Sequence, residues 1–185
     1  MPEVLLAACG VSVRFGGLTA VDGVDLEVRG AELVGVIGPN GAGKTTFFHT
    51  LSGILAPTEG RLIVGGADLT GRPAHVFAVH GVARTFQTPR VFREMSAEDN
   101  VRFGLQFAGR VRRHPHDAFD DARSILGFLG LAEMAAAPAG GLTPARQRLL
   151  EIGMALGARP RLLLLAEVAA GLTEAEVEAA ARLLR

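Results

Sequence analysis

The sequence predicts an α/β fold in which a mainly parallel sheet is flanked by helices. The apolar run at 162–165 is typical of a strand buried on both faces, as strands of parallel sheets are. A second apolar run at 32–37 leads into a glycine-rich turn and then an apolar helical segment at 46–54. With 185 residues and 49% hydrophobic content, the chain suits one domain with a substantial core.

The N-terminal part predicts antiparallel strands ahead of that turn. Residues 4–14 and 24–37 are rich in leucine and β-branched residues, with turn signals at 16–17 and 22–23. They predict an N-terminal antiparallel β subdomain, and 61–64 predicts one more strand. Phe15 lies at the first turn, where its ring could stack on a nucleobase or simply cover the hairpin, and the residues alone favour the second role.

The glycine-rich turn satisfies the phosphate-loop pattern G-x-x-x-x-G-K-[ST]. It comprises Gly38, Pro39, Asn40, Gly41, Ala42, Gly43, Lys44, Thr45 and Thr46. The glycines allow successive backbone N–H groups to face one point, where the N-terminus of the next helix adds its positive end. Lys44, the only lysine of the chain, would reach the β- and γ-phosphates, and Thr45 would offer its hydroxyl to Mg²⁺. The alternative is a glycine-rich turn that precedes a lysine by chance, and the strand and helix around it favour phosphate binding.

The later segments predict helices with one extended stretch. Residues 73–80 favour a helix, 81–86 an extended segment, and the pattern is helical again from Ser96 and over 117–131. Thr143 fits an N-cap with Pro144 at the first helical position, and 173–185 begins with a capping box.

Charge and composition restrict the classes of function. Nineteen basic and nineteen acidic residues give a net charge of zero, so no overall field points to nucleic acid. The basic run at 110–116 is followed by aspartates and suits a solvated loop better than a metal or nucleic-acid site. One cysteine excludes a disulfide framework, and no apolar run approaches the roughly 20 residues of a membrane span. We therefore expect a soluble protein, or one held at a membrane by a partner.

Several motifs together resemble the nucleotide-binding subunits of ABC transporters, most of all the ATP-binding proteins of branched-chain amino-acid importers. They are the stretches 14–21 (RFGGLTAV), 38–46, 84–87 (RTFQ), 147–152 (QRLLEI) and 169–172 (AAGL). The resemblance covers essentially the whole chain. It implies a P-loop NTPase fold, a single nucleotide-binding domain over 1–185 and a helical subdomain at approximately 88–158.

The resemblance also implies ligands and partners. ATP and Mg²⁺ would be the cofactors, with Phe15 stacked on adenine and 38–46 around the phosphates. Gln87 would touch Mg²⁺ or the attacking water, Glu167 would polarise that water, and Thr143 would face the ATP held by a second copy. Two such domains would form a homo- or heterodimer on transmembrane permease subunits, at the cytoplasmic face of the plasma membrane.

Three departures from the family pattern bear on hydrolysis. Ala166 replaces the aspartate that precedes the catalytic glutamate, and Pro144 and Ala145 alter the signature segment. The sequence also stops before the strands and the switch histidine that complete the family's catalytic site, so we expect C-terminal strands to be missing and the domain to be incomplete. We expect nucleotide binding to survive better than turnover. The alternatives are an ATPase subunit of an importer and a truncated, hydrolysis-deficient relative, while a kinase or GTPase is disfavoured because no Asn-Lys-x-Asp pattern exists.

Overall fold

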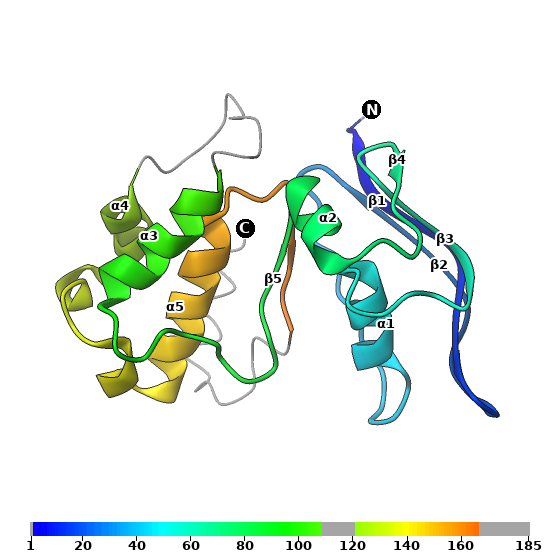
Figure 1. The fold of residues 1–185 in the computed structure, drawn as a ribbon, viewed down its shortest axis with the longest axis horizontal. Coiled ribbons are helices and arrows are strands. Elements are labelled where there is room, and N and C mark those ends of the chain that lie inside the picture. Colours follow the sequence, from blue (N-terminus) through cyan, green and yellow to red (C-terminus); the bar gives the residue numbers. More distant parts are fainter. Residues whose placement is uncertain (1, 109–120, 167–185) are drawn as a thin grey trace. The chain divides into compact units, whose positions relative to one another are not determined.

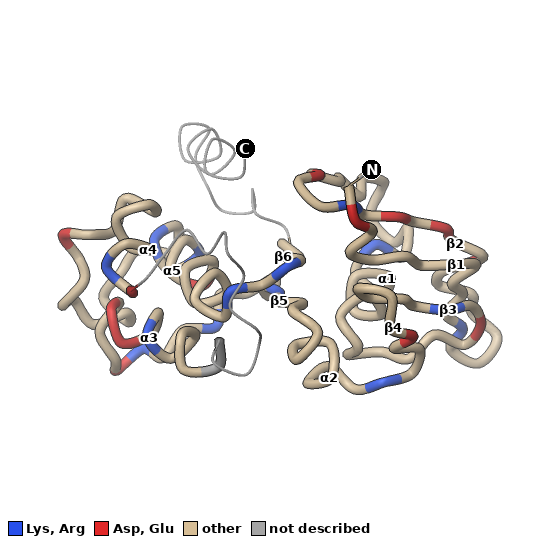
Figure 2. The backbone as a smooth tube through the Cα atoms, turned by 90° about the horizontal axis from the view of Figure 1, so that it is seen from above, with Lys and Arg blue, Asp and Glu red and all other residues tan. Residues whose placement is uncertain are grey.

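The structure is a computed structural model that describes residues 2–108 and 121–166. The chain divides into two compact units, Met1–Val82 (unit 1) and Ala83–Arg185 (unit 2). Figure 1 shows a sheet with helix α1 in unit 1 and a group of helices in unit 2. Basic and acidic residues occur in both units, as the blue and red segments of the backbone in Figure 2 show.

Unit 1 is built on a four-stranded antiparallel sheet in the order β2-β1-β3-β4. Its strands are β1 (Val4–Phe15), β2 (Leu18–Arg29), β3 (Glu59–Val64) and β4 (Ala67–Asp68). β1 and β2 form a hairpin that closes where Phe15 pairs with Leu18. The predicted N-terminal antiparallel strands are confirmed over 4–14 and 24–29, as is the strand predicted at 61–64.

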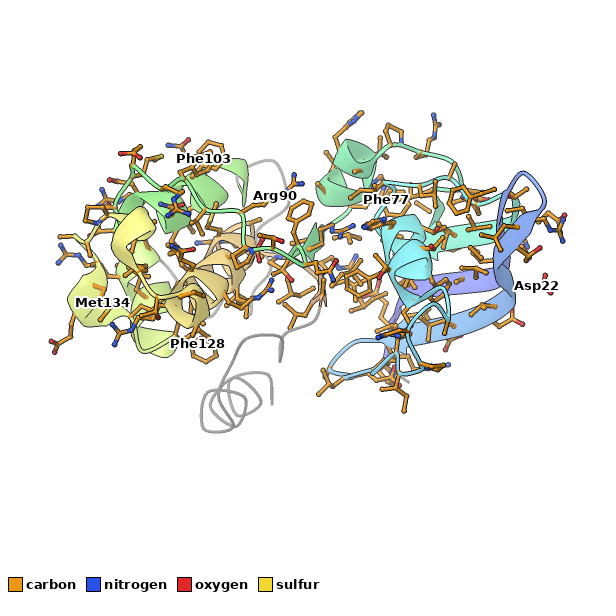
Figure 3. The ribbon with its side chains drawn as sticks, turned by 90° about the horizontal axis from the view of Figure 1, so that it is seen from below. Asp22, Phe77, Arg90, Phe103, Phe128 and Met134 are labelled. Carbon is orange, nitrogen blue, oxygen red and sulfur yellow. The ribbon has the colours of Figure 1, made fainter. Side chains whose placement is uncertain are left out.

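Helices α1 (Lys44–Leu51) and α2 (Ala74–Val79) complete unit 1. α1 buries Phe47 and Leu51 and contacts both β1 and β2. The ring of Phe77, labelled in Figure 3, is 99% buried on α2, and a Cβ at Gly53 would lie 2.4 Å from it. The segment that follows α1 is therefore fixed against α2 by a position where only hydrogen fits.

Unit 2 is mainly helical. It contains α3 (Ala97–Ala108), α4 (Ala122–Phe128) and α5 (Pro144–Gly157), with short 3₁₀ turns η1 (Ala132–Met134) and η2 (Ala139–Gly141). α3, α4 and α5 share a core that includes Val101, Ile125 and Leu150, each fully buried. Strands β5 (Val82–Arg84) and β6 (Leu162–Leu164) are neighbours in a two-stranded sheet.

Capping residues begin two of these helices. Asp121 caps α4 by accepting a hydrogen bond from the Ser124 N–H at 2.7 Å, and this bond lowers the pKa of its carboxyl. Thr143 caps α5 with Pro144 in the first turn, as predicted from the sequence. The predicted helix over 117–131 is thus observed from Ala122, and its first residues lie outside the described part.

The strand predicted at 32–37 is wrong. These residues have no regular secondary structure and pair with no described strand, and Leu33 and Ile37 are 71% and 93% exposed. An apolar run forms a strand only where a neighbour takes its backbone N–H and C=O groups, and the sheet of unit 1 places none beside it. The helix predicted at 173–185 lies outside the described residues.

No helix within 2–108 or 121–166 combines the length and the apolar character needed to cross a bilayer.

Candidate functional site

The glycine-rich turn closes around the side chain of Lys44 in unit 1. The ammonium group donates hydrogen bonds to the carbonyl oxygens of Gly38 at 2.8 Å and Pro39 at 2.7 Å. The backbone of Gly41 and Gly43 has φ of 81° and 80°, which is the left-handed region that favours glycine. The ammonium group of Lys44 is therefore the only cation of the loop, and it is bonded to carbonyl oxygens of the loop itself. A bound anion would replace these carbonyl oxygens as the acceptor of its hydrogen bonds.

Several backbone amides of the loop have no acceptor among the residues that the structure describes. Within residues 2–108 and 121–166, the N–H groups of Gly41, Gly43, Lys44 and Thr45 form no hydrogen bond. These amides lie at the start of α1, where the helix dipole is positive. Free donors, a helix N-terminus and an ammonium group are what a phosphate group requires, so the residues fit a nucleotide triphosphate.

The loop is anchored to the sheet at Gly43. A Cβ at this position would lie 2.0 Å from the carbonyl oxygen of Ala20, on β2. Ala20 follows closely on Leu18, which pairs with Phe15, so the loop is packed beside the end of the hairpin that carries Phe15. The Phe15 ring is 51% exposed and can accept a planar ligand on its face.

Thr45 and Thr46 occupy the first turn of α1. The side chain of Thr45 is exposed and its hydroxyl forms no hydrogen bond within the described part of the chain, so it can serve as a ligand of Mg²⁺. Thr46 accepts a bond on its carbonyl from the Thr50 hydroxyl at 2.9 Å, within the helix. Among the described residues no group of three or more His, Cys, Asp or Glu side chains is placed to hold a metal by itself. A Mg²⁺ ion at Thr45 would thus depend on the oxygens of a nucleotide for most of its coordination.

Gln87 lies in unit 2, in the loop that follows β5. Its side chain is exposed, and its carbonyl oxygen accepts a hydrogen bond from Arg148 Nη2. Two guanidinium groups lie over the neighbouring Phe86 ring, Arg84 at 4.8 Å and Arg90 at 4.3 Å from its centre. Burial, and then the charge of Arg90, lower the pKa of Arg84, while Glu151 opposes this effect. Arg90 is labelled on this loop in Figure 3.

Thr143 and the altered signature residues lie at the start of α5. The Thr143 hydroxyl accepts a hydrogen bond from the Arg146 N–H at 3.4 Å, so this oxygen already serves the helix as its cap. Pro144 removes one N–H from the helix N-terminus. Ala145 is buried, so its methyl group belongs to the packing of α5. The signature segment therefore has fewer groups left to donate to a phosphate than the family pattern implies, because Pro144 has no N–H and the Thr143 hydroxyl already caps the helix.

Ala166 follows β6 and is half-buried, and its N–H donates to Thr85 Oγ1 at 3.0 Å. Its methyl side chain offers no oxygen at this position. Glu167, the predicted catalytic carboxylate, lies outside the described residues. The structure thus gathers Phe15 and residues 38–46 in unit 1 and places Gln87 and Thr143 in unit 2.

Sequence reasoning missed a buried ion pair in unit 2. Arg148 and Glu151, both on α5, are each 4% exposed, and Arg148 Nη1 lies 3.3 Å from Glu151 Oε2. The sequence offered one indication of this ion pair, which is the spacing of three residues on a predicted helix, because opposite charges at i and i+3 face each other. The pair also contacts the Gln87 loop.

The ABC transporter family profile matches residues 21–170 of this chain. The chain is 40% identical over 190 aligned positions to the high-affinity branched-chain amino acid transport ATP-binding protein BraF of Pseudomonas aeruginosa. It is 41% identical over 191 positions to the protein of the same description, LivG, of Escherichia coli K12. Each alignment covers 96% of this chain and 74% of the relative.

Solved structures agree with this assignment. The ADP conformation of an ATP-binding cassette of an ABC transporter superposes with a TM-score of 0.84 at 28% identity, covering 98% of this chain and 76% of that one. A nucleotide-free ATP-binding cassette gives a TM-score of 0.80 at 28% identity, covering 96% and 74%. The fold is thus the α/β fold of P-loop ABC cassettes, with an antiparallel β subdomain and helices. The chain belongs to the ABC transporter family, in which its relatives BraF and LivG are branched-chain amino acid transport ATP-binding proteins.

Proposed function

We propose that this chain is the ATP-binding subunit of an ABC importer, which couples ATP binding and hydrolysis to the uptake of branched-chain or other small amino acids. The observation that carries the proposal is the loop 38–46. Its amides of Gly41, Gly43, Lys44 and Thr45 form no hydrogen bond within the described part of the chain, and the Lys44 ammonium group is bonded to the loop's own carbonyl oxygens. The amino-acid substrate rests on the names of the relatives BraF and LivG.

The resemblance to the nucleotide-binding subunits of ABC transporters implies a role for each of these residues. Lys44 and the loop amides would bind the phosphates, and the exposed Phe15 ring would stack on the adenine. Mg²⁺, with Thr45 and Gln87 as its protein ligands, would neutralise charge on the phosphate groups. Glu167 would orient and deprotonate a water molecule, and Thr143 would contact the nucleotide held by a second nucleotide-binding domain.

The proposed partners are a second nucleotide-binding domain, in a homo- or heterodimer, and the transmembrane permease subunits of the importer. The chain would then lie at the cytoplasmic face of the plasma membrane, attached through those subunits. Copurification with the permease subunits, followed by ATP-dependent uptake of labelled leucine into vesicles, tests this assembly. Uptake that proceeds equally without this chain would refute it.

Equilibrium titration with a fluorescent ATP analogue tests the binding function. Wild-type protein should bind, and Lys44→Ala should weaken affinity at least about tenfold, because a charge-assisted bond to phosphate is worth about 1.5–3 kcal/mol. Arg61→Ala is the matched control, since Arg61 is an exposed cation on β3 of the same unit. Folded protein that binds no nucleotide, or equal losses in both variants, would refute the proposal.

A second candidate is a nucleotide-binding, hydrolysis-deficient member of the family. Ala166, which has no oxygen to offer, and Pro144, which lacks an N–H, favour it. Phosphate release by the chain with its partner subunits distinguishes the two candidates. Mg²⁺-dependent turnover that Lys44→Ala abolishes supports the importer ATPase, whereas ATP binding without turnover supports the second candidate.

A further inference from the structure

The loop that carries Gln87 is held by two buried side chains of α5. Arg148 donates from Nη1 to the carbonyl oxygen of Phe86 and from Nη2 to that of Gln87. Glu151 Oε1 accepts from the N–H of Phe86 at 3.2 Å and of Arg90 at 3.0 Å. Four backbone groups between 86 and 90 thus bond to this pair, which we call the α5 clamp.

Stability alone does not explain the clamp. A buried ion pair is often no more stabilising than apolar side chains of similar volume, because both charges lose their hydration. Here Arg148 Nε is also buried without a hydrogen-bond partner in the described part of the chain, which adds to the cost. What the pair supplies, and apolar side chains could not, is the set of bonds to the loop.

The clamp joins two functional segments. Arg148 and Glu151 lie near the middle of α5, the helix that Thr143 caps, and their contacts fix the backbone on both sides of the Gln87 side chain. A helix is stiff over this length, so a displacement of its N-terminus moves the clamp and the loop together. The Gln87 side chain itself remains exposed.

We propose that Arg148 and Glu151 are positioning residues, which hold the Gln87 loop in fixed register with the helix that begins at Thr143. The catalytic part of this proposal rests on the proposed ATPase function. Loss of the clamp should release the loop and lower turnover, while ATP affinity changes little because the phosphate loop belongs to unit 1.

The test compares two double variants that both lack the ion pair. In R148M/E151Q the amide oxygen can still accept from the Phe86 and Arg90 N–H groups, whereas in R148M/E151M no acceptor remains. The two side chains at 151 have similar volume. R102M is a matched control, because Arg102 is an exposed cation of α3 and pairs with Glu98 of the same helix.

Amide hydrogen exchange of the Phe86 and Arg90 N–H groups, followed by NMR, reports on the loop without any nucleotide. We expect exchange about tenfold faster in R148M/E151M than in R148M/E151Q, as loss of one net hydrogen bond implies, and wild-type rates in R102M. Equal exchange in the two double variants would overturn the proposal. So would faster exchange spread over all of α5, which would indicate a merely structural role.

The charge-reversed variant R148E/E151R gives an independent check if a methionine variant fails to fold. It can restore an ion pair, but the guanidinium group at 151 cannot accept from the Phe86 and Arg90 N–H groups, and the carboxylate at 148 cannot donate to the Phe86 and Gln87 carbonyl groups. Fast exchange at the loop is therefore expected to persist, and restored wild-type protection would overturn the proposal.

Phosphate release tests the catalytic part. kcat should be at least about tenfold lower in R148M/E151M than in R148M/E151Q, with KM for ATP within about twofold. Equal rates in the two variants, including no release in either, would overturn this part. Wild-type protein that binds no ATP would refute the proposed function. The exchange experiment needs no nucleotide, so it would still test whether Arg148 and Glu151 hold the Gln87 loop.

Discussion

Replacing Gly43 with alanine should disrupt the anchoring of the phosphate loop on the sheet. The new Cβ would lie 2.0 Å from the Ala20 carbonyl oxygen, far inside contact distance, and the neighbour is backbone that cannot turn aside. The residue would also keep φ of 80°, a conformation that alanine adopts only with strain. Gly41 offers the matched control, because its φ is 81° and nothing lies within 4 Å of its Cβ position.

The two substitutions differ mainly in the steric contact. Left-handed strain costs about 1–2 kcal/mol per residue and applies to both. Overpacking adds about 1–3 kcal/mol at Gly43 alone. We therefore expect Gly41→Ala to lower the free energy of unfolding by about 1–2 kcal/mol and Gly43→Ala by about 2–5 kcal/mol. A difference of 1–3 kcal/mol corresponds to a factor of about 5–150 in the folding equilibrium.

Urea unfolding followed by circular dichroism measures these free energies, and titration with a fluorescent ATP analogue measures affinity. Gly43→Ala should lose more unfolding free energy and more affinity for the ATP analogue than Gly41→Ala. Equal destabilisation by the two variants would refute the contact with Ala20 as the anchor of the loop. Unchanged affinity in a folded Gly43→Ala protein would refute the role of that anchor in binding.

Three further predictions concern other residues of the site. Phe15→Ala should raise the Kd for ATP about tenfold, as loss of one stacking contact implies, and should leave the binding of inorganic triphosphate unchanged. The control is Leu18→Ala, at an exposed residue of the same turn. An equal rise in Kd for ATP in the control would exclude stacking on Phe15. Ala166→Asp should raise Mg²⁺-dependent phosphate release about tenfold by adding a carboxylate at the end of β6, and an unchanged rate would argue against a metal role for this position. Thr143→Ala should lower the free energy of unfolding by about 1 kcal/mol, because it removes the cap of α5, and thermal unfolding should show a lower Tm. Thr143→Ser keeps the hydroxyl and should keep the stability. Equal losses of stability in both variants would contradict the role of Thr143 as a cap.

Local chemistry was enough to predict the elements whose cause lies within a few residues. The hairpin of β1 and β2 follows from β-branched runs around the Gly16–Gly17 turn. The start of α5 follows from a threonine hydroxyl placed before a proline. The tight turn at 38–46 follows from its glycines, since Gly41 and Gly43 have the positive φ that glycine adopts readily, while its binding of phosphate stays a prediction.

Features that depend on distant neighbours were not predictable in the same way. Residues 32–37 have the composition of a buried strand, but a strand needs a paired neighbour, and composition does not reveal whether one is present. The contact of Gly43 with Ala20 and the α5 clamp on residues 86–90 each join segments more than 20 residues apart. Glu167, the predicted catalytic carboxylate, stays a prediction because it lies outside the described residues.

The position of Lys44 also gives the chain a built-in chemical reporter. Because no other lysine occurs, an acylating reagent directed at side-chain amines would have a single target, and that target lies at the mouth of the loop. A bound anion would shield it. The extent of acylation at this one position, read by mass spectrometry, would therefore measure occupancy of the loop in an unpurified mixture without any engineered label.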